Sequence, residues 1–116
     1  MKLRVGHADY AVMAMDPDTH DDFGTNAGEC CNATMVILVD PTLPPSEQGR
    51  TLLHEALHAV WDVYGLPATV TQEGACSRLE GPLLCLIRDN PHMVAAIVGC
   101  TEGKKLKLPV FMEDAD

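Results

Sequence analysis

Hydrophobic and polar residues follow two different periods along this chain. Residues 2–5 alternate between charged and apolar side chains, and the mainly apolar segment 10–15 continues this character. A period of two is typical of half-buried β-strands. Residues 35–39 (MVILV) form a compact, partly β-branched run, which predicts a well-buried strand. The first forty residues are therefore expected to form β structure.

A segment dense in turn formers separates these strands. Residues 16–28 read DPDTHDDFGTNAG and predict a long exposed loop, in which we expect His20 to be solvated. After residue 39 the sequence DPTLPP ends strand pairing, because proline supplies no backbone N–H.

The pattern then becomes helical. Residues 51–64 contain neither Gly nor Pro and consist mostly of competent helix formers. Ser46 is a natural N-cap with Glu47 in the first turn, and Gly65 followed by Pro67 predicts the end of the helix.

Apolar residues cover nearly the whole circumference of this helix, so we expect it to be buried at the centre of the domain. Its main apolar stripe comprises Leu53, Leu57, Val60 and Tyr64. Its single polar sector comprises Thr51, His54, Glu55, His58 and Asp62.

The rest of the chain predicts further helices and one more strand. A second helix is expected from residues 69–71 to Asp89, with a kink or a break at Gly81-Pro82. Asn90-Pro91 ends it, and residues 92–98 predict a further short helix. Alternation over residues 106–112 predicts a C-terminal edge strand.

Length and composition exclude several classes of protein. The 116 residues are expected to form one domain, 1–116, with an acidic tail at about 113–116. Hydrophobic residues make up 47% and charged residues 22%, which is typical of a folded globule. A formal net charge of −9 argues against nucleic acid as a ligand. There is no apolar run of about 20 residues for a membrane span and no secretory h-region, so we expect a cytoplasmic protein without a membrane partner.

The cysteines and the lysine cluster add little chemistry. The five cysteines include no C-x-x-C pair, and we expect reduced, mostly buried thiols. Cys30 and Cys31 are adjacent, so a strand would point them to opposite faces. The basic cluster Lys104, Lys105 and Lys107 is expected to be a solvated strand or turn.

The strongest chemical signal is the sequence His54-Glu55-Ala-Leu-His58. Residues four apart share one face of a helix, so the two imidazoles could bind one zinc ion. A glutamate directly after the first histidine could polarise a water in an open zinc position. Asp62 could accept a hydrogen bond from an imidazole. The alternative is a buried helix whose histidines bond to backbone carbonyls, but burying two imidazoles and a carboxylate without a cation is costly.

A catalytic zinc site usually has three protein ligands and one water. The following helix offers Glu73 and Glu80, and helix rise and the reach of a glutamate side chain allow either one. No group that would stabilise a transition state stands out, with Tyr10 and His20 as the candidates.

These segments resemble, in their order, the small phage and bacterial proteins related to ImmA/IrrE-type metallopeptidases, which are minimal zincins. The similarity extends from about Gly28 to Pro91 and includes GEC at 28–30, VILVD at 36–40, TLLHEALHA at 51–59 and QE at 72–73. The resemblance implies that His54, His58 and Glu73, in preference to Glu80, bind Zn²⁺ and that Glu55 is the general base. The family often has two acidic residues where this chain has Gln72-Glu73, and a bulky apolar pair where it has Gly74-Ala75.

The expected fold is therefore α+β, a minimal zincin-like domain with a small twisted sheet packed on a central HExxH helix and a second antiparallel helix. The expected function is zinc-dependent hydrolysis of a peptide bond in a protein or peptide substrate, in the host cytoplasm if the protein is phage-encoded. A partner protein or the loop 16–28 could present the substrate. One alternative is a non-catalytic, zinc-stabilised protein-binding module of phage or bacterial origin. Another is a metal-independent fold with an accidental motif.

Overall fold

The computed structural model describes residues 1–20 and 26–112. Within these residues four strands form one mixed sheet in the order β1-β2-β4-β3. The predicted acidic tail 113–116 and the middle of the predicted loop 16–28 lie outside the described residues. The strands are β1 (Lys2–Val5), β2 (Ala8–Ala14), β3 (Gly28–Cys31) and β4 (Val36–Val39).

The predicted alternation places apolar side chains on one face of the sheet. β1 and β2 form an antiparallel hairpin around Gly6, whose φ of +58° suits a glycine. β2 pairs with β4 in parallel, and β3 pairs with β4 antiparallel, so β3 lies at one edge. The inward side chains are almost inaccessible to solvent. They include Leu3, Val5, Tyr10, Val12, Ile37 and Val39.

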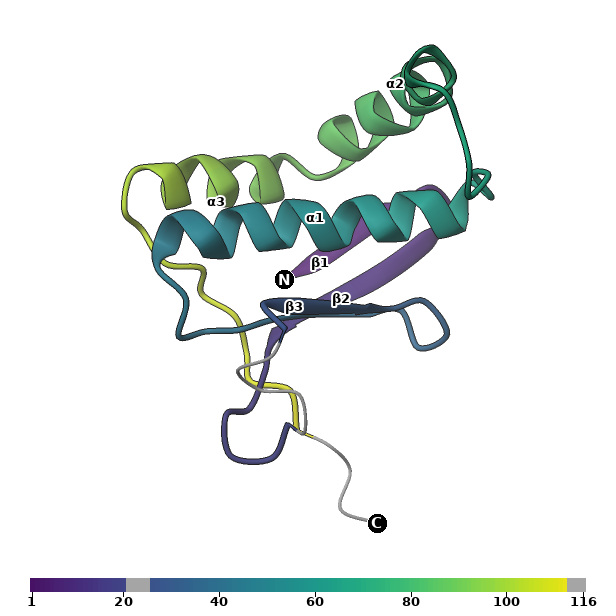
Figure 1. The fold of residues 1–116 in the computed structure, drawn as a ribbon. Coiled ribbons are helices and arrows are strands. Elements are labelled where there is room, and N and C mark those ends of the chain that lie inside the picture. The colour runs from purple at the N-terminus through teal and green to yellow at the C-terminus, as the bar shows by residue number, and fades with distance from the viewer. Residues whose placement is uncertain (21–25, 113–116) are drawn as a thin grey trace.

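Three helices follow within the described residues: α1 (Pro45–Val63), α2 (Gln72–Asp89) and α3 (Pro91–Thr101). Figure 1 shows all three on the same side of the sheet, with α1 between the sheet and α3. The coarse α+β class is therefore confirmed. The helix that packs along α1 is α3, whereas α2 packs mainly against β1. The expectation that the second helix would pair with α1 is therefore wrong.

The start of α1 differs from the prediction that Ser46 is its N-cap. The helix begins at Pro45, its N-cap is Pro44, and no side chain caps it. Proline is well suited to the first helical position, because its φ is already helical and its missing N–H would have no partner there. The end agrees with the prediction, since α1 stops at Val63 and Gly65 adopts a φ of +61°.

α2 begins as predicted after Thr71, whose hydroxyl accepts a hydrogen bond from the Gly74 backbone N–H at 3.0 Å. It continues through Pro82 to Asp89, so the sequence at Gly81-Pro82 does not break it. In Figure 1 the ribbon of α2 changes direction between its two halves, as expected where proline removes a backbone donor.

α3 begins directly after Asn90, and the axes of α2 and α3 differ in direction by 90°. The Asn90 side chain is buried and joins this junction to β1. Its Nδ2 donates to the carbonyls of Arg4 and Leu86, both at 2.8 Å, and its Oδ1 accepts from the Arg4 N–H at 2.7 Å. Among the described residues no single helix has the length and apolar character needed to cross a membrane, although the bent pair α2 and α3 meets both criteria when taken together.

The expectation that α1 is buried on nearly all sides is wrong. Only the face toward the sheet and α3 is buried, and Leu53 and Tyr64 on the predicted apolar stripe are 41% and 37% exposed. α2, the next helix along the chain, packs mainly against β1 and not over this stripe, and Tyr64 lies beside the turn at Gly6.

The predicted C-terminal strand at 106–112 is also wrong. In this segment only Val110 forms a bridge, which is parallel to Ala14. The Ala14 N–H donates to the Pro109 carbonyl and the Phe111 N–H donates to the Ala14 carbonyl, both at 2.8 Å. Pro109 cannot donate a ladder hydrogen bond, which explains why no continuous strand forms.

Candidate metal centre

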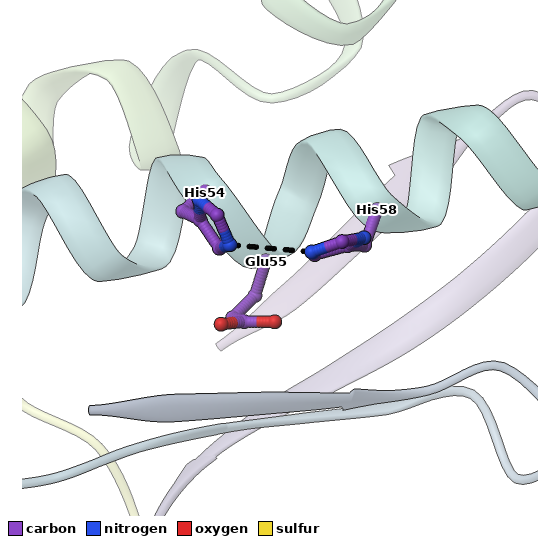
Figure 2. Close-up of side chains that lie close together, drawn as sticks. All are labelled: His54, Glu55 and His58. Carbon is purple, nitrogen blue, oxygen red and sulfur yellow. Dashed lines mark hydrogen bonds between the residues drawn. The ribbon is translucent and has the colours of Figure 1, made fainter. Parts of the chain in front are cut away.

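Packing of α1 determines where its polar side chains point. Leu52, Ala56 and Ala59 are fully buried against the sheet and α3. This arrangement leaves His54 and His58 exposed on one flank and turns Glu55 toward the sheet. Figure 2 shows both imidazoles along the same side of the helix and the carboxylate extending from it toward the strand below.

The two imidazoles point at each other. Nε2 of His54 lies 3.2 Å from Nε2 of His58, and the ring centroids are 4.8 Å apart with a T-shaped arrangement. Together with Glu55, one ligand atom from each residue lies within 4.8 Å of the others. Neither histidine bonds to a backbone carbonyl among the described residues, contrary to the alternative of a buried helix with satisfied histidines.

This geometry fits a tetrahedral metal ion. Zinc–nitrogen bonds of about 2.0–2.1 Å at a tetrahedral angle place two ligand nitrogens about 3.3 Å apart. The separation of 3.2 Å between the two Nε2 atoms is close to that value. The same separation is that of a hydrogen bond between the two rings, so the distance is compatible both with a shared ion and with a direct contact between His54 and His58.

Glu55 is the buried member of the group. The residue as a whole is 7% exposed. Its carboxylate accepts no hydrogen bond from any described residue, and because no buried side-chain oxygen there lacks a partner, the carboxylate oxygens reach solvent. Burial raises its pKa, the nearby Glu29 carboxylate adds to this effect, and charge on His54 and His58 opposes it. A carboxylate in this environment holds a proton more readily than one on the surface.

Gly28 on β3 allows Glu55 to occupy this position. A Cβ atom at residue 28 would lie 2.5 Å from Cγ2 of Thr51 and 3.1 Å from Cγ of Glu55. No motif in the sequence predicts this role for Gly28. The available signal was a glycine within a strand, which often marks close approach of another element.

Two surface cavities lie on the β3 side of the histidines, and Glu55 lines both. One, of about 380 Å³, extends past His54 to Arg50 and Glu47. The other, of about 410 Å³, extends past His58 to Asn32 and Glu29. Together they give solvent and a ligand access to Glu55 from both sides.

His20 is not the solvated side chain that was predicted. Its side chain is only 12% exposed, and Nε2 lies 2.8 Å from Oε1 of Glu29 on β3. Glu29 is a residue that sequence analysis missed, and it lines the same cavity as Glu55 and His58. No motif surrounds it, so only the fold reveals its place.

The remaining predicted residues are placed elsewhere. Glu73, in the first turn of α2, and Glu80 are both exposed, and neither belongs to the group formed by His54, Glu55 and His58. The role of Glu73 as third ligand stays a prediction. Asp62 is exposed and shares a cavity with His58, but no hydrogen bond joins them among the described residues.

All five cysteines are free thiols, as expected, but they are not mostly buried. Only Cys100 is buried, and Cys31 and Cys76 are exposed. Cys30 and Cys31 differ in solvent exposure, as expected for neighbouring residues on opposite faces of a strand. Burial raises the pKa of Cys30 to about 11, whereas hydrogen bonds from Thr34 lower the pKa of Cys31.

Tyr10 is buried beneath this edge of the sheet. Its hydroxyl donates to Oδ1 of Asn32 at 2.9 Å, and burial raises its pKa to about 12. Both properties suit a structural phenol.

Comparisons with protein-family models, with curated proteins and with solved structures gave no match to this chain.

Proposed function

We propose that this protein is a zinc-dependent peptidase of the minimal zincin type. The observation that carries the proposal is the approach of the His54 and His58 Nε2 atoms to 3.2 Å beside Glu55, a residue that is only 7% exposed. Two exposed imidazoles at tetrahedral ligand spacing, next to a carboxylate without a donor, are the elements of an open catalytic zinc site.

His54 and His58 would bind the ion, and Glu73 is proposed as the third ligand. Zinc in such a site supplies Lewis acidity and lowers the pKa of a coordinated water toward about 7. Because the pKa of Glu55 is raised by burial, its carboxylate is suited to accept a proton at one stage and return it to the leaving amine at the next.

The edge strand β3 supports a peptide as the substrate. Within the described residues β3 pairs only with β4, and its other edge carries no strand. Unpaired N–H and C=O groups on a strand edge can bind an extended chain by adding it to the sheet. β3 contacts α1 at Glu55, so a chain bound there would pass close to the proposed catalytic group.

The test combines metal analysis with hydrolysis. Elemental analysis should find about one zinc per parent chain and a loss of zinc in His54→Ala. Glu55→Gln should retain zinc and cleave a quenched-fluorescent peptide library at least about 100-fold more slowly. Glu102→Gln, an exposed carboxylate just after α3, is the control and should behave like the parent.

Each other outcome is informative. Absence of zinc from the parent protein, or unchanged cleavage by Glu55→Gln, would refute the proposed mechanism. Stoichiometric zinc without cleavage of any library member would favour the zinc-stabilised binding module instead.

A further inference from the structure

A third cavity lies on the side of the histidines opposite to Glu55. Its volume is about 320 Å³, and its lining consists of His54, Leu57, His58 and Trp61. On a helix with about 100° between successive residues, Leu57 and Trp61 flank the two histidines on one side and Glu55 lies on the other. The cavity therefore adjoins the proposed metal site without including the proposed base.

All four lining residues lie on one face of α1; beside the two imidazoles the lining is apolar, and Trp61 is held in place by the loop that follows α1. The indole N–H of Trp61 donates to the Pro67 carbonyl at 3.0 Å, and the Trp61 carbonyl accepts from the Leu66 N–H at 2.9 Å. The only polar atom of the Trp61 side chain is thus occupied by the α1–α2 loop. The indole ring and the half-buried Leu57 then offer hydrocarbon surface to whatever enters.

Nothing in the described chain fills this space. α2 packs mainly against β1, and Leu53, one turn before Leu57, is 41% exposed. Hydrocarbon surface next to a polar reaction site is typical of a binding subsite, and ligand cavities range upward from about 300 Å³. The cavities on the other side are lined instead by charged and amide side chains, including Glu29 and Asn32.

We infer that Leu57 and Trp61 form a specificity subsite for an apolar side chain of the substrate, next to the bond that is cleaved. This inference rests on the proposed peptidase function, because the histidines that line the cavity are the proposed metal ligands. A peptide carbonyl held near both Nε2 atoms would have a neighbouring side chain within reach of Leu57. Leucine or phenylalanine would displace water from that surface, whereas serine or aspartate would lose hydration without gaining a partner.

The chain contains one tryptophan, so fluorescence from Trp61 reports directly on this cavity. The probes are N-acetylated, C-amidated pentapeptides Ala-Ala-X-Ala-Ala with X as Leu, Phe, Ser or Asp. They would be titrated into Glu55→Gln, with and without zinc, so that binding is measured without cleavage. We expect saturable changes in emission and at least about tenfold tighter binding for Leu and Phe than for Ser.

Leu57→Ser in the same background should reduce the preference for Leu over Ser to near unity. Leu53→Ser removes a leucine from the same stripe of α1, outside the cavity lining, and should leave the preference unchanged. Equal affinities for all four peptides, no binding of any, or a preference unaffected by Leu57→Ser would each overturn the inference. The peptide series on the Glu55→Gln protein decides the matter even if Leu57→Ser fails to fold.

The two proposals fail in different ways. Selective binding of the Leu and Phe peptides, without hydrolysis by the zinc-loaded parent, would leave Leu57 and Trp61 as a binding site for an apolar side chain and refute the peptidase. Hydrolysis of all four peptides at equal kcat/KM would leave the peptidase and refute the subsite.

Discussion

Gly28 on β3 and Glu55 on α1 occupy complementary positions. A Cβ on Gly28 would lie 3.1 Å from Cγ of Glu55 and 2.9 Å from the Leu38 carbonyl oxygen. Only a hydrogen atom fits between strand and helix at this point. The edge strand thus provides the space in which the carboxylate is held, and the absence of a side chain there is part of the site.

Gly28→Ala should therefore destabilise the fold and displace Glu55. Overpacking of this kind costs about 1–3 kcal/mol, which denaturant unfolding would measure. Gly99→Ala is the matched control, because a Cβ there meets only side-chain atoms of Lys104, at 3.6 and 3.7 Å, and residue 99 lies inside α3. The control should stabilise the protein by about 0.5–1 kcal/mol. A Gly28→Ala protein as stable as the parent would contradict the close packing of β3 on α1.

The third metal ligand can be identified by comparing two carboxamide variants. Glu73→Gln should weaken zinc binding by at least about tenfold, and Glu80→Gln should have little effect. Competition with a zinc-binding dye measures both affinities. If Glu80→Gln loses zinc and Glu73→Gln retains it, the assignment that follows from family resemblance is wrong. Equal affinities in both variants would place the third ligand outside α2.

The adjacent thiols Cys30 and Cys31 should differ strongly in reactivity. Cys31 is exposed and its pKa is lowered by hydrogen bonds from Thr34, whereas burial raises the pKa of Cys30 to about 11. The thiolate is the reactive form, so iodoacetamide at pH 8 should label Cys31 well before Cys30. Peptide mapping by mass spectrometry gives the order of labelling. Simultaneous labelling of both residues in the folded protein would show that β3 does not protect Cys30.

Alkaline pH should destabilise the protein through Tyr10. Its pKa in the folded state is about 12, compared with 10.0 when unperturbed. Between these pH values the folded state binds more protons than the unfolded state. The contribution of Tyr10 to the free energy of unfolding is therefore fully present below pH 10 and is lost as the pH rises toward 12. Unfolding by denaturant at a series of pH values would measure this slope. Tyr10→Phe should lose less stability between pH 10 and pH 12 than the parent, and an identical slope would argue against a buried phenol.

Local patterns predicted the elements well where short-range physics decides them. The alternation in residues 2–5, the apolar run at 35–39 and the helix start expected at residues 69–71 correspond to β1, β4 and the start of α2. Each depends on neighbouring residues or on backbone chemistry that is visible in the sequence. The spacing of His54 and His58 likewise predicted that they share one face of the helix, and their rings lie in contact on that face.

Predictions failed where distant parts of the chain decide the outcome. The apolar stripe that includes Leu53 was predicted to be buried because a helical wheel shows which side chains are apolar but not which element packs against them. α2 packs mainly on β1, and Leu53 is exposed. His20 and Glu29 pair across the loop between β2 and β3, which no periodicity reveals. The role of Gly28 depends on how closely α1 approaches β3, and sequence patterns do not predict the direction in which the chain leaves the turn before α1.

The one-sided packing of α1 limits where this chain can change in length. An added residue ahead of Leu52 would rotate the rest of the helix by about 100° relative to its buried face, carrying the two histidines away from β3. Either the core or the site would then be lost. Homologues that keep this chemistry should therefore show no insertion or deletion between residues 45 and 58.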